Sequence, residues 1–273
     1  MHCAIIYDFD GTLAQGDCAE HGLMPSLGIE NKTEFWNNVK ELTKEKDADE
    51  ILMYLWKLYE IANKRNELIK LSNTYLQNYG KKIPLFKGVE SWFDIINRYA
   101  ADNGIGLSHY IISSGLEEMI KGTSIAKNFK KIFACKYSYN KTGIPEWPAL
   151  SINYTTKTQF LFRINKGIEN CWDNSAVNRF VEPSLRPIPF SNMIYIGDGD
   201  TDIPAMKMVK NQGGHSIAVF NPDLWEKETT QNKIQKLIAE ERTDYVVPAD
   251  YQEHSQLMVS VKGILQLIKR KNS

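Results

Sequence analysis

Two aspartates, Asp8 and Asp10, stand directly after an apolar run that covers residues 3–7. The run predicts a short strand covered on both faces, and open parallel sheets bind their ligands at the carboxyl ends of such strands. On extended chain the two carboxylates share a side, so their charges repel unless a cation or a shared proton lies between them. Taken alone, residues 8–12 also fit a simple turn, because Asp and Gly are common turn residues.

A second acidic cluster, with Asp198, Asp200 and Asp202, follows another apolar run at residues 193–196. If both strands belong to one parallel sheet, the two acidic strand ends converge on one oxygen-rich site that suits a hard cation such as Mg²⁺. A calcium-binding loop is the alternative, but the glutamate expected at its twelfth position is replaced by Val209.

With these motifs the sequence resembles the haloacid dehalogenase superfamily, in its phosphoserine-phosphatase-like branch with a helical C1-type cap after the first strand. Four motifs occur in the family's order over nearly the whole chain: residues 8–12, residues 111–115, Lys157 and residues 197–202. The resemblance implies that Asp8 is the nucleophile, which forms a phospho-aspartyl intermediate. It implies that Asp10 is the general acid and base, and an acid at this position favours phosphate-ester chemistry.

The second motif, Ile111-Ile112-Ser113-Ser114-Gly115, implies contacts to the phosphoryl group. Ser113 would donate to the phosphoryl oxygens, and the backbone N–H groups of Ser114 and Gly115, at the start of a helix, would add donors for an anion. A helix cap without any ligand is the alternative.

The third motif is a lysine that neutralises the phosphoryl group in the transition state. Lys157 fits it best because it lies at the start of a predicted helix; Lys141 lies in the preceding loop and Lys166 near the other end of that helix. A surface lysine without such a role is the alternative.

The fourth motif implies that Asp198 binds magnesium together with the Asp8 carboxylate and the Asp10 main-chain carbonyl. Asp202 would support the ligands from behind, and Asp200 is interpreted as a solvated loop residue. Asp17 stands where phosphoserine phosphatases carry a glutamate that recognises the substrate's amino group, so it is a candidate substrate-binding residue.

The elements that must position these residues alternate between apolar runs and helical patterns, which predicts an α/β fold: a Rossmann-like, doubly wound parallel sheet. Residues 17–83 show helical spacing only and are predicted to form a cap, with residues 1–16 and 84–273 as the core. Residues 137–154 fit a hairpin or a loop, a helix is expected from Thr155 or Thr156 as its cap, and residues 170–191 form a polar insertion.

The composition narrows the possible partners. Thirty-three basic residues balance thirty-three acidic ones, so no overall field favours nucleic acid or an anionic membrane. Charges interrupt every apolar stretch, and four scattered cysteines fit neither a zinc site nor a disulfide framework. The sequence therefore predicts a cytoplasmic protein.

The most direct hypothesis is a Mg²⁺-dependent phosphatase that acts on a small phosphorylated metabolite. A phosphotransferase or phosphomutase with the same intermediate, and a non-catalytic binding protein with this fold, are the alternatives. The sequence predicts neither the physiological substrate nor the oligomeric state.

Overall fold

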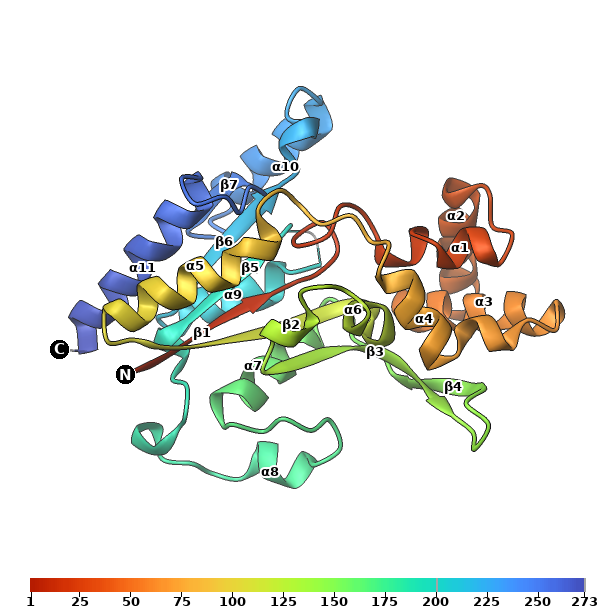
Figure 1. Cartoon of the computed structure of the whole chain (residues 1–273), viewed down its shortest axis with the longest axis horizontal. Helices are drawn as coiled ribbons and strands as arrows, with labels where there is room; N and C mark the ends of the chain where they lie inside the picture. The colour runs from red at the N-terminus through yellow and green to blue at the C-terminus, as the bar shows by residue number, and fades with distance from the viewer. Residues whose placement is uncertain (200, 273) are drawn as a thin grey trace.

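The computed structural model describes residues 1–199 and 201–272. Its core is a seven-stranded sheet with the order β4-β3-β2-β1-β5-β6-β7, in which β1 is the central strand (Figure 1). All neighbouring strands run parallel except β3 and β4. The strands are β1 (His2–Tyr7), β2 (Gly106–Leu116), β3 (Lys131–Tyr139), β4 (Pro145–Leu150), β5 (Met193–Gly197), β6 (His215–Phe220) and β7 (Tyr245–Pro248).

Helices cover both faces of this sheet. Figure 1 shows α5 and α11 together on one side and α7 and α9 on the other, and each of these pairs is in contact. Apolar residues one turn apart, such as Trp92 and Ile96 of α5, are buried against the sheet, as amphipathic spacing predicts. The helices are α1 (Leu23–Ser26), α2 (Lys32–Lys46), α3 (Glu50–Lys64), α4 (Asn73–Gly80), α5 (Val89–Asp102), α6 (Glu117–Lys121), α7 (Lys157–Asn165), α8 (Asn174–Asn178), α9 (Ile203–Asn211), α10 (Glu228–Ala239) and α11 (Gln256–Asn272).

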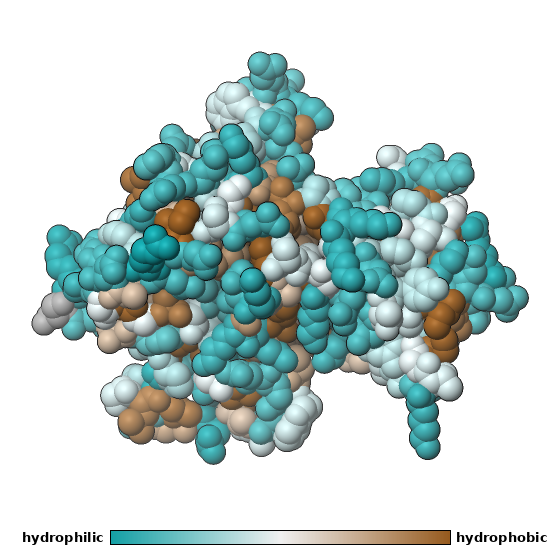
Figure 2. All heavy atoms as spheres, viewed as in Figure 1, coloured by the Kyte–Doolittle hydropathy of each residue, from teal (hydrophilic) through white to brown (hydrophobic). Residues whose placement is uncertain are grey.

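The α/β fold with a mostly parallel sheet is thus confirmed. The burial of β1 is the pattern that such a sheet requires. The side chains of Ile5, Ile6 and Tyr7 are all completely buried, so this strand is covered on both faces. Hydrophilic residues occupy most of the outer face seen in Figure 2, with apolar residues showing between them. Within residues 1–199 and 201–272, no helix has both the length and the apolar composition needed to cross a membrane.

The chain between β1 and β2 carries α1 to α4, which lie beyond one end of the sheet in Figure 1. Side-chain caps begin the two long helices: Asn31 accepts from the Glu34 N–H at 3.1 Å, and Asp49 accepts from the Leu52 N–H at 2.7 Å. The helical character expected for residues 17–83 is therefore present, whereas their separation as a cap domain stays a prediction.

Residues 137–154 form a hairpin rather than a loop, because β3 continues into the antiparallel strand β4. The hairpin reaches the helical block, since the Tyr137 hydroxyl donates to the Leu55 carbonyl of α3 at 2.6 Å. This contact links the sheet to α3 near the end of the sheet where the acidic motifs lie.

Two basic side chains hold the insertion at residues 170–191: Arg163 of α7 and Lys166, which directly follows this helix. The buried Arg163 guanidinium donates to the Asn170, Cys171 and Asp173 carbonyls at 3.0–3.2 Å. Lys166 donates to the Val177 and Arg179 carbonyls. Lys166 therefore has a structural role in this insertion, away from the acidic motifs.

Candidate active site

The two acidic motifs meet at the carboxyl ends of β1 and β5, which are adjacent parallel strands. The Asp8 N–H donates to the Ile196 carbonyl at 2.9 Å, which ties the end of one strand to the other. One carboxylate oxygen from each of Asp8, Asp198 and Asp202 lies within 4.8 Å of the other two. The convergence expected from the sequence is therefore present. Asp200, interpreted above as a solvated loop residue, lies outside the described residues.

Lys157 is completely buried among these carboxylates. Its ammonium lies 3.1 Å from Asp8 Oδ1, 2.7 Å from Asp202 Oδ1 and 3.2 Å from Thr201 Oγ1. Burial alone lowers the pKa of this lysine, but Asp202 and Asp8 outweigh burial and raise the pKa above its ordinary value. The ammonium is therefore charged. Lys141, one of the two rival lysines, is exposed in the turn of the hairpin.

Lys157 reaches the site because α7 begins at this residue. Thr156 occupies the N-cap position, as expected for one of the two threonines, but its side chain accepts no hydrogen bond from the first turn of the helix. The Asn153 side chain instead accepts from the N–H groups of both threonines, at 3.2 and 2.9 Å, and the Thr156 hydroxyl accepts from the Asn153 N–H. An Asx turn thus precedes the helix.

Asp202 is completely buried and is held by two donors on one oxygen. Its Oδ1 atom accepts from Lys157 and, at 2.7 Å, from the Tyr195 hydroxyl of β5. The sequence analysis missed Tyr195. A tyrosine in the middle of a buried strand was the available signal, because a buried phenolic hydroxyl usually finds a hydrogen-bond partner.

The second motif lies in an irregular end of β2, not at the start of a helix. The pairing of β2 with β3 shifts register between Ser113 and Leu116, and α6 begins only at Glu117. The Gly115 N–H donates to Ser113 Oγ at 3.0 Å, so the expected free N–H donor at position 115 is wrong. The bulge turns Ser114 toward the site, where its buried hydroxyl has no hydrogen-bond partner in the protein.

Gly115 allows this segment to pack against the first motif. A Cβ atom at this position would lie 2.7 Å from Asp10 Oδ2 and 2.9 Å from Cys18 Sγ, closer than such atoms approach in proteins. A larger residue would therefore displace the Asp10 carboxyl group.

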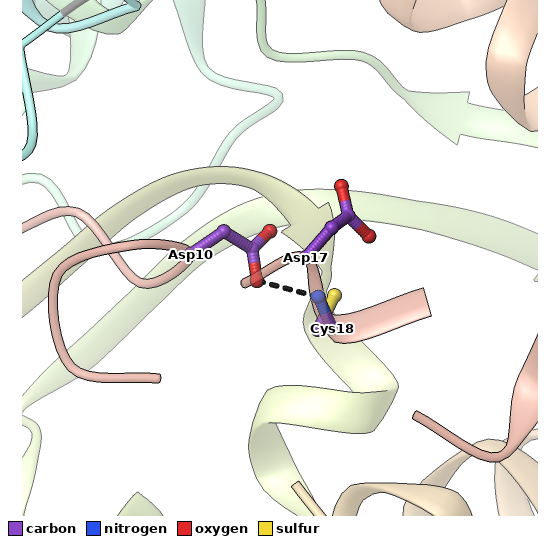
Figure 3. A group of neighbouring side chains, drawn as sticks. All are labelled: Asp10, Asp17 and Cys18. Carbon is purple, nitrogen blue, oxygen red and sulfur yellow. Dashed lines mark hydrogen bonds between the residues drawn. The ribbon is translucent and has the colours of Figure 1, made fainter. Parts of the chain in front are cut away.

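Asp10, Asp17 and Cys18 form a second group of side chains (Figure 3). The Cys18 N–H donates to Asp10 Oδ1 at 2.8 Å, and Asp17 Oδ1 accepts from the Ala19 N–H at 2.8 Å. Burial, with the charges of Asp17 and Asp8, raises the pKa of Asp10 well above its ordinary value. Burial also raises the pKa of Asp17 to about 6. Asp10 therefore tends to hold a proton.

The oxygens of the first group fit a small, hard divalent cation. Asp202 Oδ2 and Asp8 Oδ1 are buried without a hydrogen-bond partner, although Asp8 Oδ1 forms the ion pair with Lys157. Burial and the charge of Asp202 raise the pKa of Asp8 to about 8, although Lys157 opposes this shift. Carboxylates that repel one another and keep oxygens without hydrogen-bond partners are the ligand set that such cations bind.

A cavity of about 390 Å³ opens over both groups of carboxylates. Asp8, Asp10, Asp17 and Ser114 lie on its core side. Residues of α2 and α3 close the opposite side, namely Trp36, Lys40, Glu50 and Ile51, and Tyr154 lies at its edge. A small molecule bound here would contact both the sheet and the helical block.

Sequence comparisons give a relative of similar length but no family. No protein-family model matches the sequence. An uncharacterized protein of Borreliella burgdorferi is 28% identical over 289 residues, which cover 93% of each chain.

Solved structures share the fold at low sequence identity. A substrate-bound phosphoserine phosphatase matches 96% of this chain and 98% of its own, with 17% identity and a TM-score of 0.56. A haloacid dehalogenase family hydrolase from Salmonella enterica serovar Typhi matches 96% of this chain and 70% of its own, with 15% identity and a TM-score of 0.53. The chain therefore has the fold of the haloacid dehalogenase superfamily, in the form found in phosphoserine phosphatases.

Proposed function

We propose that this chain is a Mg²⁺-dependent phosphatase that hydrolyses a small phosphomonoester through a phospho-aspartyl intermediate on Asp8. The observation that carries the proposal is the position of Asp8, with the Lys157 ammonium at 3.1 Å and the oxygens of Asp198 and Asp202 within 4.8 Å. The shared fold with phosphoserine phosphatases supports it. The cytoplasm suits the chain, since its four cysteines are free thiols.

In the first step, an Asp8 carboxylate oxygen attacks phosphorus and the bond to the leaving alkoxide breaks. Lys157 neutralises charge on Asp8 and on the phosphoryl oxygens as the transition state forms. Because this ammonium is held by Asp202, it is already oriented before the substrate binds. Little rearrangement is therefore needed at the moment of reaction.

Asp10 acts as general acid and then as general base. Its raised pKa keeps a proton available for the leaving alkoxide, and the resulting carboxylate then accepts a proton from the water that hydrolyses the phospho-enzyme. The Cys18 N–H bond to Asp10 Oδ1 sets the orientation of this carboxyl group. Asp10 thus recovers its proton in each cycle.

Magnesium would be held by the Asp8 carboxylate, the Asp10 main-chain carbonyl and Asp198, with Asp202 supporting them from behind. When bound, it supplies positive charge that relieves the repulsion among these oxygens and stabilises charge on the phosphoryl group. The buried carboxylate oxygens without hydrogen-bond partners support this ligand set.

Ser113 and Ser114 would contact the phosphoryl group, while the Gly115 N–H is used within the motif. The unpartnered Ser114 hydroxyl in the cavity supports a direct contact, whereas Ser113 Oγ already accepts the Gly115 N–H and keeps its own proton for a phosphoryl oxygen. Asp17, on the wall of the same cavity, would bind a cationic group of the substrate.

The test is phosphate release from an aryl phosphate in the presence of Mg²⁺. Asp8→Asn is expected to abolish turnover, because an amide is a poor nucleophile, while Asp94→Asn on the exposed surface of α5 serves as the control. Trapping of ³²P on the protein in acid should require Asp8. Wild-type turnover in the Asp8→Asn variant would exclude the mechanism, and phosphate transfer to added alcohols above transfer to water would identify a phosphotransferase.

A further inference from the structure

Lys233 of α10 reaches the metal-ligand candidate Asp198 from outside the four motifs. Its ammonium lies 3.2 Å from Asp198 Oδ2, and the two side chains are 30% and 31% exposed. Along the chain, α10 follows β6 and precedes β7, and Lys233 lies 35 residues after Asp198. The sequence analysis did not single it out.

The stem of Lys233 packs on the loop that carries Asp198. Gly199 has a φ of +117°, and a Cβ atom at this position would lie 3.3 Å from Lys233 Cε and 3.1 Å from Leu237 Cδ1. The absence of a side chain at residue 199 therefore lets α10 approach the loop closely. Lys233 and Asp198 also line a common cavity of about 210 Å³ beside the site.

The charges of the site are divided between two lysines. Lys157 is the cation for Asp8 and Asp202, and it is completely buried. Asp198 has Lys233 as its cation, and this pair is accessible to solvent. The two lysines thus differ in exposure: the Lys157 side chain has no contact with solvent, whereas 30% of the Lys233 side chain is exposed, which lowers the cost of separating it from its carboxylate.

We propose that Lys233 is the resident counter-ion of Asp198, which a divalent cation must displace to bind at this carboxylate. The inference rests on the metal site of the proposed function. Breaking a partly exposed ion pair has a modest cost, so Lys233 weakens metal binding without preventing it. Its role is to tune the affinity of the site, and it is not a catalytic residue.

The experiment is a calorimetric titration of the full-length, metal-free protein with MgCl₂ at fixed ionic strength and without substrate. Lys233→Met keeps the stem that packs on Gly199 and removes the ammonium. Its dissociation constant for Mg²⁺ is expected to fall roughly three- to fivefold, the size of effect that a partly exposed ion pair provides. Competition with Mn²⁺, followed by electron paramagnetic resonance, gives an independent measure of the same affinity.

Two further variants separate contact from general charge effects. Lys236→Met removes an exposed lysine three residues along the same helix and should leave the affinity within about twofold of wild type, because exposed charges beyond contact distance are screened. Lys233→Arg keeps the charge and should also stay near wild type. Circular dichroism and thermal unfolding verify that each variant is folded.

The outcomes distinguish this inference from the proposed function. Unchanged or weaker Mg²⁺ binding by Lys233→Met would overturn the counter-ion role while leaving the proposed phosphatase activity in place. The same holds if Lys236→Met or Lys233→Arg gains as much Mg²⁺ affinity as Lys233→Met. A wild-type protein that binds no Mg²⁺ would overturn both. Tighter binding by Lys233→Met in a protein that hydrolyses no phosphate ester would support the counter-ion and contradict the phosphatase.

Discussion

The ammonium of Lys157 and the carboxylate of Asp202 form an ion pair of 2.7 Å in which both side chains are completely buried. The lysine begins α7 and the aspartate precedes α9, so the pair joins two helices that lie on the same face of the sheet. Tyr195 adds a second hydrogen bond to the same aspartate oxygen. A buried pair of this kind is costly to break from one side, because the remaining charge has no water to solvate it.

Replacement of Lys157 by Met is expected to destabilise the protein by about 3 kcal/mol at pH 7 and to abolish turnover. The loss should be smaller at pH 5, where the stranded carboxylates can take up a proton. Urea unfolding at both pH values measures the change, with Lys141→Met, an exposed lysine, as the control. A stable variant with normal turnover would remove Lys157 from the site.

Asp17→Asn is expected to move the alkaline limb of the kcat profile to lower pH. The general acid Asp10 must hold a proton, so activity falls as pH rises through its pKa. The charge of Asp17 contributes to raising that pKa, so its removal lowers the pKa. Asparagine keeps the oxygen that accepts from the Ala19 N–H, which preserves the local backbone. If kcat of Asp17→Asn falls at the same alkaline pH as kcat of the control Asp94→Asn, this electrostatic coupling is contradicted.

Metal-free protein is expected to lose stability as pH rises from about 4 to about 8. Burial raises the pKa of Asp17 from 3.8 to about 6 and the pKa of Asp8 from 3.8 to about 8. Between the unfolded and folded pKa values the folded state binds more protons, so the free energy of unfolding decreases with pH.

Calorimetric unfolding in EDTA measures this decrease, and Mg²⁺ should reverse it at pH 8 because it replaces the bound protons. Asp8→Asn should show a shallower pH dependence than wild type. A stability of the metal-free protein that rises over this range would show that the carboxylates are stabilised in their charged form.

Tyr7→Phe is expected to destabilise the core by about 1–3 kcal/mol, because it leaves buried polar groups unpaired. Trp92 donates to the Tyr7 hydroxyl at 2.8 Å, and this hydroxyl lies 3.0 Å from His109 Nδ1. Since His109 Nε2 lies 2.9 Å from Oδ1 of the Asn97 side chain, Nε2 carries the proton and Nδ1 accepts from Tyr7. Burial lowers the pKa of His109 to about 3, so the ring is neutral.

Thermal unfolding of Tyr7→Phe at pH 7 tests this network. Exposed Tyr75→Phe is the matched control and should unfold at the wild-type temperature. Equal stability of the two variants would mean that water satisfies the remaining groups.

Most of the sheet and the convergence of the two acidic motifs could be predicted from the sequence. Aspartates follow apolar runs such as residues 193–196 within one or two positions. Because neighbouring parallel strands end at the same edge of the sheet, these aspartates come together. The long helices could also be predicted, because their apolar residues recur at every third or fourth position. These features depend only on local patterns and on general rules of chain connection.

The contacts that the sequence did not reveal depend on side chains that meet across the fold. Lys233 resembles any other lysine of a surface helix until α10 is placed beside the loop of Asp198. The bulge at Ser113 and Ser114 arises where β2 leaves its pairing with β3, which no local pattern records. Thr156 is the N-cap residue of α7, but the side chain that accepts from N–H groups ahead of this helix belongs to Asn153, and residues of both types begin helices.

The central place of β1 has a consequence for the motions of the site. Parallel strands hydrogen-bond to it on both sides, so its amide protons should exchange with solvent deuterium only in molecules that open globally. Asp8 directly follows this strand. We expect the amide protons of α1 to α4 to exchange faster than those of β1, because these helices lie outside the sheet, so that their opening leaves the residue that is proposed to attack phosphorus in place.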